Sequence, residues 1–168
     1  MKKLFFIILL LLYSNTLFAQ EEISFIDIDL VLSNSNYGKK VVQKLKNKND
    51  QNIMELENSE IELKKIEEDI NKVKNIISED ELNKKISELK NKIVLYREKK
   101  DLKFKEYNSY KNKELEFFFK KITPFVEEFM ELNSIKILIE KKNIFIAKAN
   151  YDRTDELINF LNLKIKND

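Results

Sequence analysis

The sequence predicts an α+β protein, in which a long antiparallel helical hairpin is inserted between the strands of a small β body. The chain has 168 residues but only one glycine and one proline, so turns are scarce and long helices are expected. Apolar residues recur at alternating three- and four-residue steps through the middle, the pattern of a coiled-coil helix. Short stretches rich in isoleucine stand near both ends and indicate strands.

The first nineteen residues have the layout of an export signal. Lys2 and Lys3 precede the apolar run LFFIILLLLY, and a polar stretch ends at the small residue Ala19, after which cleavage is expected. The apolar run is shorter than a membrane span, which needs about 20 residues. Residues 1–19 are therefore predicted to be a signal peptide, and an uncleaved anchor is the less favoured alternative.

Composition excludes several kinds of chemistry. Without cysteine or histidine, the chain has no disulfide, no thiol and neither of the commonest metal-binding side chains, so we predict no enzyme activity and no catalytic, cofactor or metal site. Once Lys2 and Lys3 are removed, 29 basic and 29 acidic residues remain. Residues 39–121 carry 22 basic and 17 acidic side chains. This excess of positive charge reflects either an electrostatic field with a function or ordinary solvent-exposed helix faces. No basic stripe dense enough for nucleic acid is present.

The stretch ISFIDIDLVL predicts the first strand. Ile26 and Ile28 alternate with Asp27 and Asp29, as in a half-buried strand. The two carboxylates could suggest metal or acid–base work, but a structural role is favoured, with Asp29 capping a short helix. The polar connector SNSNYG offers N-caps for the helix that follows.

The hairpin is predicted from two stripes of mostly apolar residues, which we call seams because the two helices are expected to pack along them. One runs from Val42 to Ile77 and the other from Leu82 to Phe117, separated at Ser78, where a capping box with Glu81 starts a new helix. So short a link makes the helices antiparallel neighbours. Their facing residues are apolar near the bend but polar in the middle, where Ser59 is expected opposite Lys100. We therefore expect the arm to bend near Asn49, Asn52 and Ser59, unless neighbouring chains or off-seam residues supply the packing.

The C-terminal part predicts two more strands and a helix. SIKILIE and IFIAKA alternate around the turn EKKN, and residues 152–163 form an amphipathic helix capped by Asp152 or Thr154. Residues 20–37 and 122–168 would form the body, and residues 38–121 the arm, with its tip near 78–81. Three short strands and one helix bury little surface, so the body is expected to oligomerise.

The segment EFFFKKITPF marks the return of the arm to the body. Phe117 is expected to continue the seam against Val42, and Phe119 to reach a neighbouring subunit or the sheet. The helix is expected to kink at Pro124 rather than stop. The predicted body and subunit-contact core comprises Ile26, Ile28, Phe118, Phe119, Ile122, Phe125, Phe129, Ile137, Ile139 and Phe145.

This arrangement resembles the Skp/OmpH family of periplasmic chaperones. The likeness is carried by ISFIDIDLVL with YGKKVVQKL, and by ITPFVEEFMELNSIKILIEKKNIFIAKANYDRTDELINFLN. The resemblance implies a jellyfish-like homotrimer in the periplasm, whose arms surround a cavity and hold unfolded outer-membrane β-barrel proteins without ATP. The best-known members are strongly basic overall, whereas the mature chain is formally neutral. A membrane surface or lipopolysaccharide is therefore a weaker expected partner, and no residues match a site for it.

On this interpretation the arms contact the unfolded protein that the chaperone holds, which is called its client. The expected contact residues are Phe104, Tyr96, Tyr107, Tyr110, Lys100 and Lys103, because aromatic rings and lysine stems offer large amphipathic contact area. The three tyrosines equally fit a seam-filling role, which is favoured, whereas Phe104 lies off the seam. The competing function is an envelope spacer or adaptor coiled coil without chaperone activity.

Overall fold

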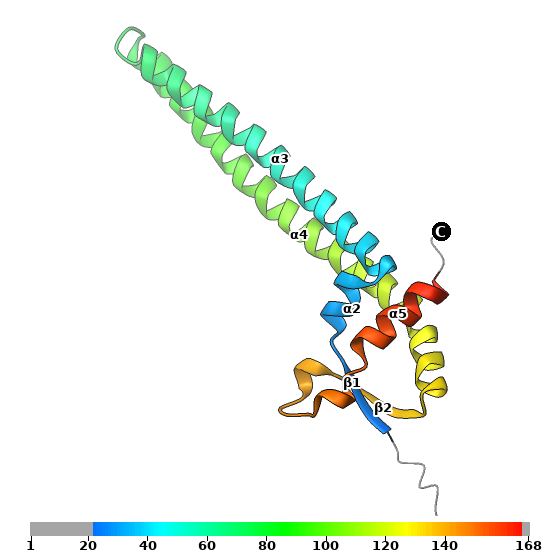
Figure 1. Cartoon of the computed structure of the whole chain (residues 1–168). Coiled ribbons are helices and arrows are strands. Elements are labelled where there is room, and N and C mark those ends of the chain that lie inside the picture. Colours follow the sequence, from blue (N-terminus) through cyan, green and yellow to red (C-terminus); the bar gives the residue numbers. More distant parts are fainter. Residues whose placement is uncertain (1–21, 166–168) are drawn as a thin grey trace, which may run out of the picture.

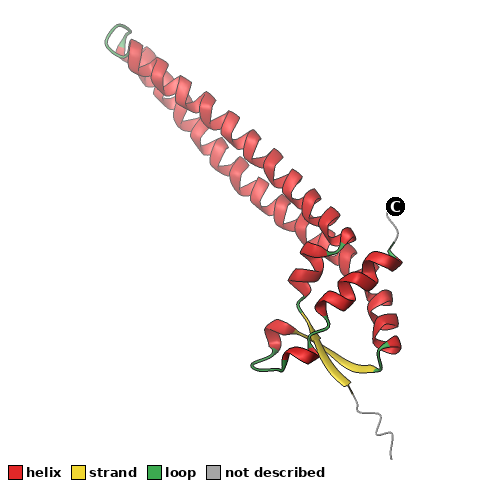
Figure 2. Ribbon diagram, in the orientation of Figure 1, coloured by secondary structure: helices red, strands yellow, loops and turns green. Residues whose placement is uncertain are grey.

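The computed structural model describes residues 22–165 of the chain, so the predicted signal peptide at 1–19 lies outside the described residues. A two-helix arm projects from a small body that contains the two strands and the two shorter α-helices (Figures 1 and 2). No helix within residues 22–165 has both the length and the apolar character that a membrane crossing requires.

The chain enters the body through strand β1 (Glu22–Ile26) and helix α2 (Ile28–Asn34). The predicted strand is therefore shorter than its Ile–Asp alternation suggested, and Ile28 begins a helix. Asp27, not Asp29, is the N-cap, because its carboxylate accepts a hydrogen bond from the Leu30 N–H at 3.1 Å. The Asp27 N–H also donates to Thr154 Oγ1 at 2.8 Å, so this residue has a structural role.

The arm consists of α3 (Asn36–Val73) and α4 (Glu79–Leu132), of 38 and 54 residues. At about 1.5 Å per residue they are about 57 Å and about 80 Å long. Ser35 caps α3 through the Gly38 N–H, and Ser78 caps α4 through the Glu81 N–H at 3.3 Å, as the sequence predicted. The turn at the tip occupies residues 74–78, slightly before the predicted 78–81.

The two helices pack antiparallel, and α4 continues through Pro124 into the body without a break. Its last turns run in a different direction from the arm (Figure 1). Near the body the predicted seam is off by one residue in each helix. Val41 and Phe118 are buried, whereas Val42 and Phe117 are 41% and 49% exposed. The helices are covered by α2 and α5 here, so these side chains face the body core rather than only each other.

The sheet has two parallel strands, β1 and β2 (Ile135–Glu140), with Ile23 opposite Ile137 and Phe25 opposite Ile139. The predicted third strand, IFIAKA, is wrong: a 3₁₀ turn, η1 (Lys141–Asn143), follows β2, and the next residues pair with no strand of the described chain. EKKN contains no Asn-Gly or Asp-Gly pair, which is the strongest short-range signal of a tight hairpin. A second 3₁₀ turn, η2 (Ala149–Tyr151), then leads to a single bridge between Asp152 and Phe25.

Helix α5 (Thr154–Lys164) closes the body by packing against α2 and α4. The N-cap residue of α5 is Arg153, which makes no side-chain cap hydrogen bond, so neither Asp152 nor Thr154 is the N-cap that the sequence predicted. The carboxylate of Asp152 instead accepts hydrogen bonds from the N–H and hydroxyl of Thr154, the first residue of the helix. The apolar side chains of α5 complete the core with α2, α3, α4 and the strands. The fully or nearly buried core side chains are Ile26, Val31, Val41, Phe118, Ile122, Phe129, Ile135, Leu157, Ile158, Leu161 and Ile165.

The single chain buries only part of the predicted body core. Of the ten residues, Ile26, Phe118, Ile122 and Phe129 are buried, and Ile28, Phe125 and Ile139 are half-buried. Phe119, Ile137 and Phe145 are 44%, 51% and 102% exposed, so they do not belong to the core of one chain. Phe119 lies in α4, Ile137 in β2 and Phe145 in the segment after η1.

Candidate functional site

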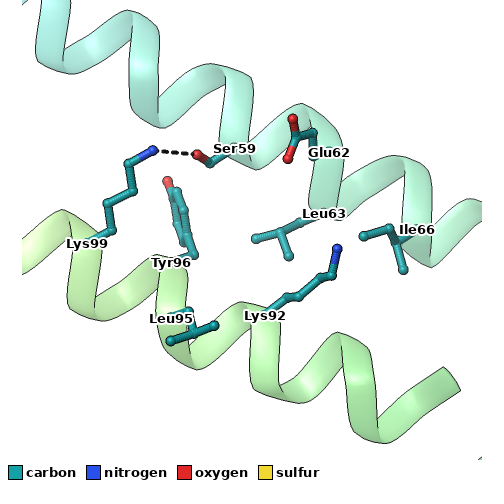
Figure 3. Close-up of a pocket in the computed structure, with 8 residues that line it drawn as sticks. All are labelled: Ser59, Glu62, Leu63, Ile66, Lys92, Leu95, Tyr96 and Lys99. Atoms are coloured by element: carbon teal, nitrogen blue, oxygen red, sulfur yellow. Dashed lines mark hydrogen bonds between the residues drawn. The ribbon is translucent and has the colours of Figure 1, made fainter. Parts of the chain in front are cut away.

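The candidate functional site is a groove along one side of the arm, between α3 and α4 (Figure 3). Among residues 22–165, no group of three or more His, Cys, Asp or Glu side chains is arranged to hold a metal ion. The groove has a volume of about 200 Å³. Its lining residues are Ser59, Glu62, Leu63 and Ile66 of α3 and Lys92, Leu95, Tyr96 and Lys99 of α4.

The floor and one wall of the groove are apolar. Leu63, Ile66 and Tyr96 belong to the seam and are half-buried between the helices, and Leu95 is 62% exposed beside them. Leu95 directly precedes Tyr96 in the sequence and therefore lies about 100° around the helix from the seam. It borders the groove rather than filling it. The short side chain of Ser59 leaves room next to Tyr96 that a leucine would occupy. The groove therefore offers apolar contact along an otherwise charged arm.

A set of polar bonds between the two helices closes the body-side end of the groove. The Lys99 ammonium donates to Ser59 Oγ at 3.0 Å and to the Glu55 carbonyl oxygen at 3.5 Å. Lys103 forms an ion pair with the Glu55 carboxylate at 2.7 Å. Its hydrogen bond and charge lower the pKa of Glu55, and the same hydrogen bond raises the pKa of Lys103. We call these residues, Glu55, Ser59, Lys99 and Lys103, the polar clasp.

Asn52 lies one turn before the polar clasp and is only 5% exposed. Its Oδ1 atom has no hydrogen-bond partner within the described chain. A buried carbonyl oxygen without a partner costs about 1–3 kcal/mol. Hydrogen bonds and an ion pair therefore hold the two helices together in the middle of the arm, around the unfavourably buried Asn52. Nearer the tip, facing pairs of apolar side chains hold them instead.

The predicted contact residues do not gather in one place. Tyr96 lines the groove, whereas Tyr107 and Tyr110 are half-buried in the seam, as the seam-filling interpretation expects. Phe104 is 67% exposed and lies outside the groove. Lys103 belongs to the polar clasp, and Lys100 is exposed, because Lys99 takes the inward position that the sequence assigned to Lys100.

The sequence prediction missed Glu62, Lys92, Leu95 and Lys99. A three-residue step from Tyr96 reaches Lys99 and a four-residue step reaches Lys100, and two adjacent lysines give no apolar signal to choose between the steps. Leu95 lies beside the seam and was not recognisable as a wall from its position alone. The sign of it in the sequence was a large apolar residue beside Tyr96, at a position where the helix was expected to face solvent.

The body carries a second apolar surface. Ile26, Ile28, Phe119, Leu138 and Ile139 line a hollow of about 230 Å³, together with Glu140 and Lys142. In the nearby segment after η1, Phe145 and Ile146 are 102% and 83% exposed. Exposed apolar side chains gathered in this way are typical of an interaction surface.

Comparisons with known proteins agree with this fold. The family model described as outer membrane protein (OmpH-like) matches residues 22–161. A crystal structure of a candidate outer membrane chaperone (OmpH-like) from Caulobacter crescentus CB15 superposes with a TM-score of 0.72, at 20% identity over 85% of each chain. At this identity the likeness concerns the fold. A search of curated proteins found no match.

Proposed function

The chain belongs to the OmpH-like family of outer membrane proteins, and on this premise we propose that it is an ATP-independent holdase chaperone of the periplasm. It binds unfolded outer-membrane β-barrel proteins and keeps them from aggregating before they insert into the membrane. The observation that carries the proposal is the arm, because a projecting hairpin with an open apolar groove among charged side chains suits weak contact with unfolded polypeptide.

The contacts proposed for the client extend beyond the groove. Phe104, with two thirds of its side chain exposed, is the strongest of the residues predicted from the sequence. Tyr96 contributes the floor of the groove, and Lys100 offers a cationic contact. Tyr107, Tyr110 and Lys103 have structural partners between the helices and are weaker candidates. Substitution of Phe104 by alanine should weaken client binding without altering the helical content measured by circular dichroism.

We also propose that three copies assemble through their bodies, so that their arms enclose a shared cavity. The hollow beside Phe119 and the exposed Phe145 and Ile146 support this proposal, because each is an uncovered apolar feature on the same part of the body. Light scattering coupled to gel filtration should give the mass of a trimer for the mature chain. A monomer at micromolar concentration would contradict the cavity mechanism.

The proposed flexibility of the arm is centred on Asn49, Asn52 and Ser59. The ion pair of the polar clasp is open to solvent, which screens its charges, so it substitutes only partly for apolar packing. The unpartnered Oδ1 of Asn52 weakens the same region. Amide hydrogen exchange should be faster in residues 49–59 than in residues 63–73, and equal protection of both segments would contradict the proposal.

The competing function is an envelope spacer or adaptor. The chaperone is favoured, because a spacer needs neither strands at both ends of its hairpin nor an open groove along it. The test is to dilute a urea-unfolded outer-membrane β-barrel protein into buffer with the mature chain and no ATP. A holdase suppresses light scattering at about stoichiometric amounts of trimer, whereas a spacer leaves it unchanged. A membrane surface or lipopolysaccharide remains the weaker proposed partner.

A further inference from the structure

We propose that the arm groove recognises a short motif in an extended polypeptide: an aromatic residue and an acidic residue two positions apart. The proposal rests on the chaperone function proposed above and specifies which segments of an unfolded client the arm takes. It is carried by the size of the groove, the apolar nature of its floor and the position of one lysine.

The size and lining of the groove suit an aromatic ring. Its volume of about 200 Å³ exceeds the roughly 150 Å³ of an apolar protein cavity that binds benzene. Leu63 and Ile66 supply aliphatic contacts, and Tyr96 supplies a ring against which another ring can pack edge-on or offset. The exposed Leu95 extends this apolar wall outward. A small or charged side chain would leave most of these contacts unmade.

Lys92 supplies the polar part of the recognition. Its side chain extends from α4 across the groove toward Ile66, and no hydrogen bond joins it to the other residues drawn in Figure 3. Within the described chain Lys92 has no ion pair, whereas Lys99, at the other end of the groove, is engaged in the polar clasp. An acidic side chain of a bound segment would therefore pair with Lys92, at the end of the groove opposite the polar clasp.

The spacing of the motif follows from helix and strand geometry. Lys92 and Tyr96 are four residues apart on α4, which is about 6 Å along the helix axis. Side chains two apart on an extended chain point to the same side and lie about 6.6–6.8 Å apart. An extended segment parallel to the arm can thus place a ring beside Tyr96 and a carboxylate beside Lys92. Glu62 lines the opposite wall and disfavours a second acidic residue facing α3.

The test uses the full mature chain and fluorescently labelled ten-residue peptides that share one polar sequence. One peptide contains Phe-Ser-Asp, and the others contain Ala-Ser-Asp or Phe-Ser-Lys at the same place. Fluorescence anisotropy should show affinity for Phe-Ser-Asp at least about tenfold above Ala-Ser-Asp, as expected for burial of a ring. The advantage over Phe-Ser-Lys should be about two- to fivefold, as for an exposed ion pair.

Charge reversal separates recognition from a structural effect. Lys92→Glu should invert the preference between Phe-Ser-Asp and Phe-Ser-Lys, whereas Lys90→Glu, an exposed change outside the groove lining, should not. Leu95→Glu should weaken binding of both phenylalanine peptides more than Val94→Glu does. Val94 is a matched control, because it is 51% exposed and does not line the groove.

The outcomes distinguish this proposal from the general function. If the unaltered chain binds the three peptides equally, or if Lys92→Glu leaves their order unchanged, the motif is overturned. If aggregation of the unfolded β-barrel protein is still suppressed in that case, the chaperone function stands and only the motif is lost. If the chain suppresses no aggregation, the general function itself is contradicted. Binding of the three peptides to the unaltered chain tests the motif even if a variant fails to fold.

Discussion

Replacing Gly38 with alanine should destabilise the protein, although alanine is the better helix former. Gly38 is the one glycine of the chain and is buried in the first turns of α3. A Cβ atom there would lie 2.0 Å from the Leu32 carbonyl oxygen and 2.7 Å from its carbonyl carbon, whereas ordinary contact begins at 3.4 Å. To make room, α2 must move by about 1.4 Å, the difference between 2.0 and 3.4 Å, relative to the root of the arm.

The size of the effect follows from two opposing contributions. Alanine gains about 1 kcal/mol over glycine in a helix interior. Overpacking costs about 1–3 kcal/mol, and the upper value applies because the clash is with backbone, which no rotamer change relieves. The expected net loss is about 2 kcal/mol, or about 4–8 °C in Tm for a chain of this size.

Thermal and urea unfolding of the mature chain, followed by circular dichroism at one protein concentration, measure this loss. Asn112→Ala is the control, because it raises helix propensity at an exposed position of α4. Its Tm should stay equal or rise slightly. An unchanged or higher Tm for Gly38→Ala would refute the reasoning that the close approach of α2 to α3 requires glycine.

Three further predictions concern the phenylalanine triplet and the polar clasp. Phe118→Ala should cost about 3–5 kcal/mol in the free energy of unfolding, because its ring is fully buried, and the half-exposed Phe117→Ala less than half as much, as measured by urea titration. Phe119→Asp should lower the mass measured by light scattering while the helical content is retained. Glu55→Gln should lower the urea midpoint near neutral pH. Since Lys103 depresses the pKa of Glu55, that difference should shrink as the pH falls below about 4.3 toward the pKa of folded Glu55, and a constant difference would contradict the ion pair's role.

The arm could be predicted from the sequence because its signals are local. The three-four rhythm and the cap at Ser78 both act within a few residues. The cap matches the structure, and the rhythm matches it except at Lys99 and near the body, where the seam is off by one residue in each helix. The errors occur where the local signal is weak. Lys99 and Lys100 are chemically the same, so only the geometry of the opposite helix, with Ser59 and Glu55 as partners, decides which lysine faces inward.

The body was predicted less well because its contacts are distant in sequence. The pairing of β1 with β2 joins residues more than 100 positions apart, and no local pattern specifies whether IFIAKA has a partner. Phe145 was placed in a core on the assumption of a third strand, and it is exposed in the single chain. Asp27 shows the same limit, because its bond to Thr154 could not be read from the Ile–Asp alternation.

The most direct test of the account is the aggregation assay with an outer-membrane β-barrel protein diluted from urea, without ATP. The mature chain should suppress light scattering at about one trimer per client, and Leu95→Glu combined with Phe104→Ala should weaken this suppression while Val94→Glu should not. Both altered positions are exposed, so the fold should be retained. Scattering equal to that of the client alone, from a correctly folded chain, would contradict the proposal that the arms hold unfolded protein.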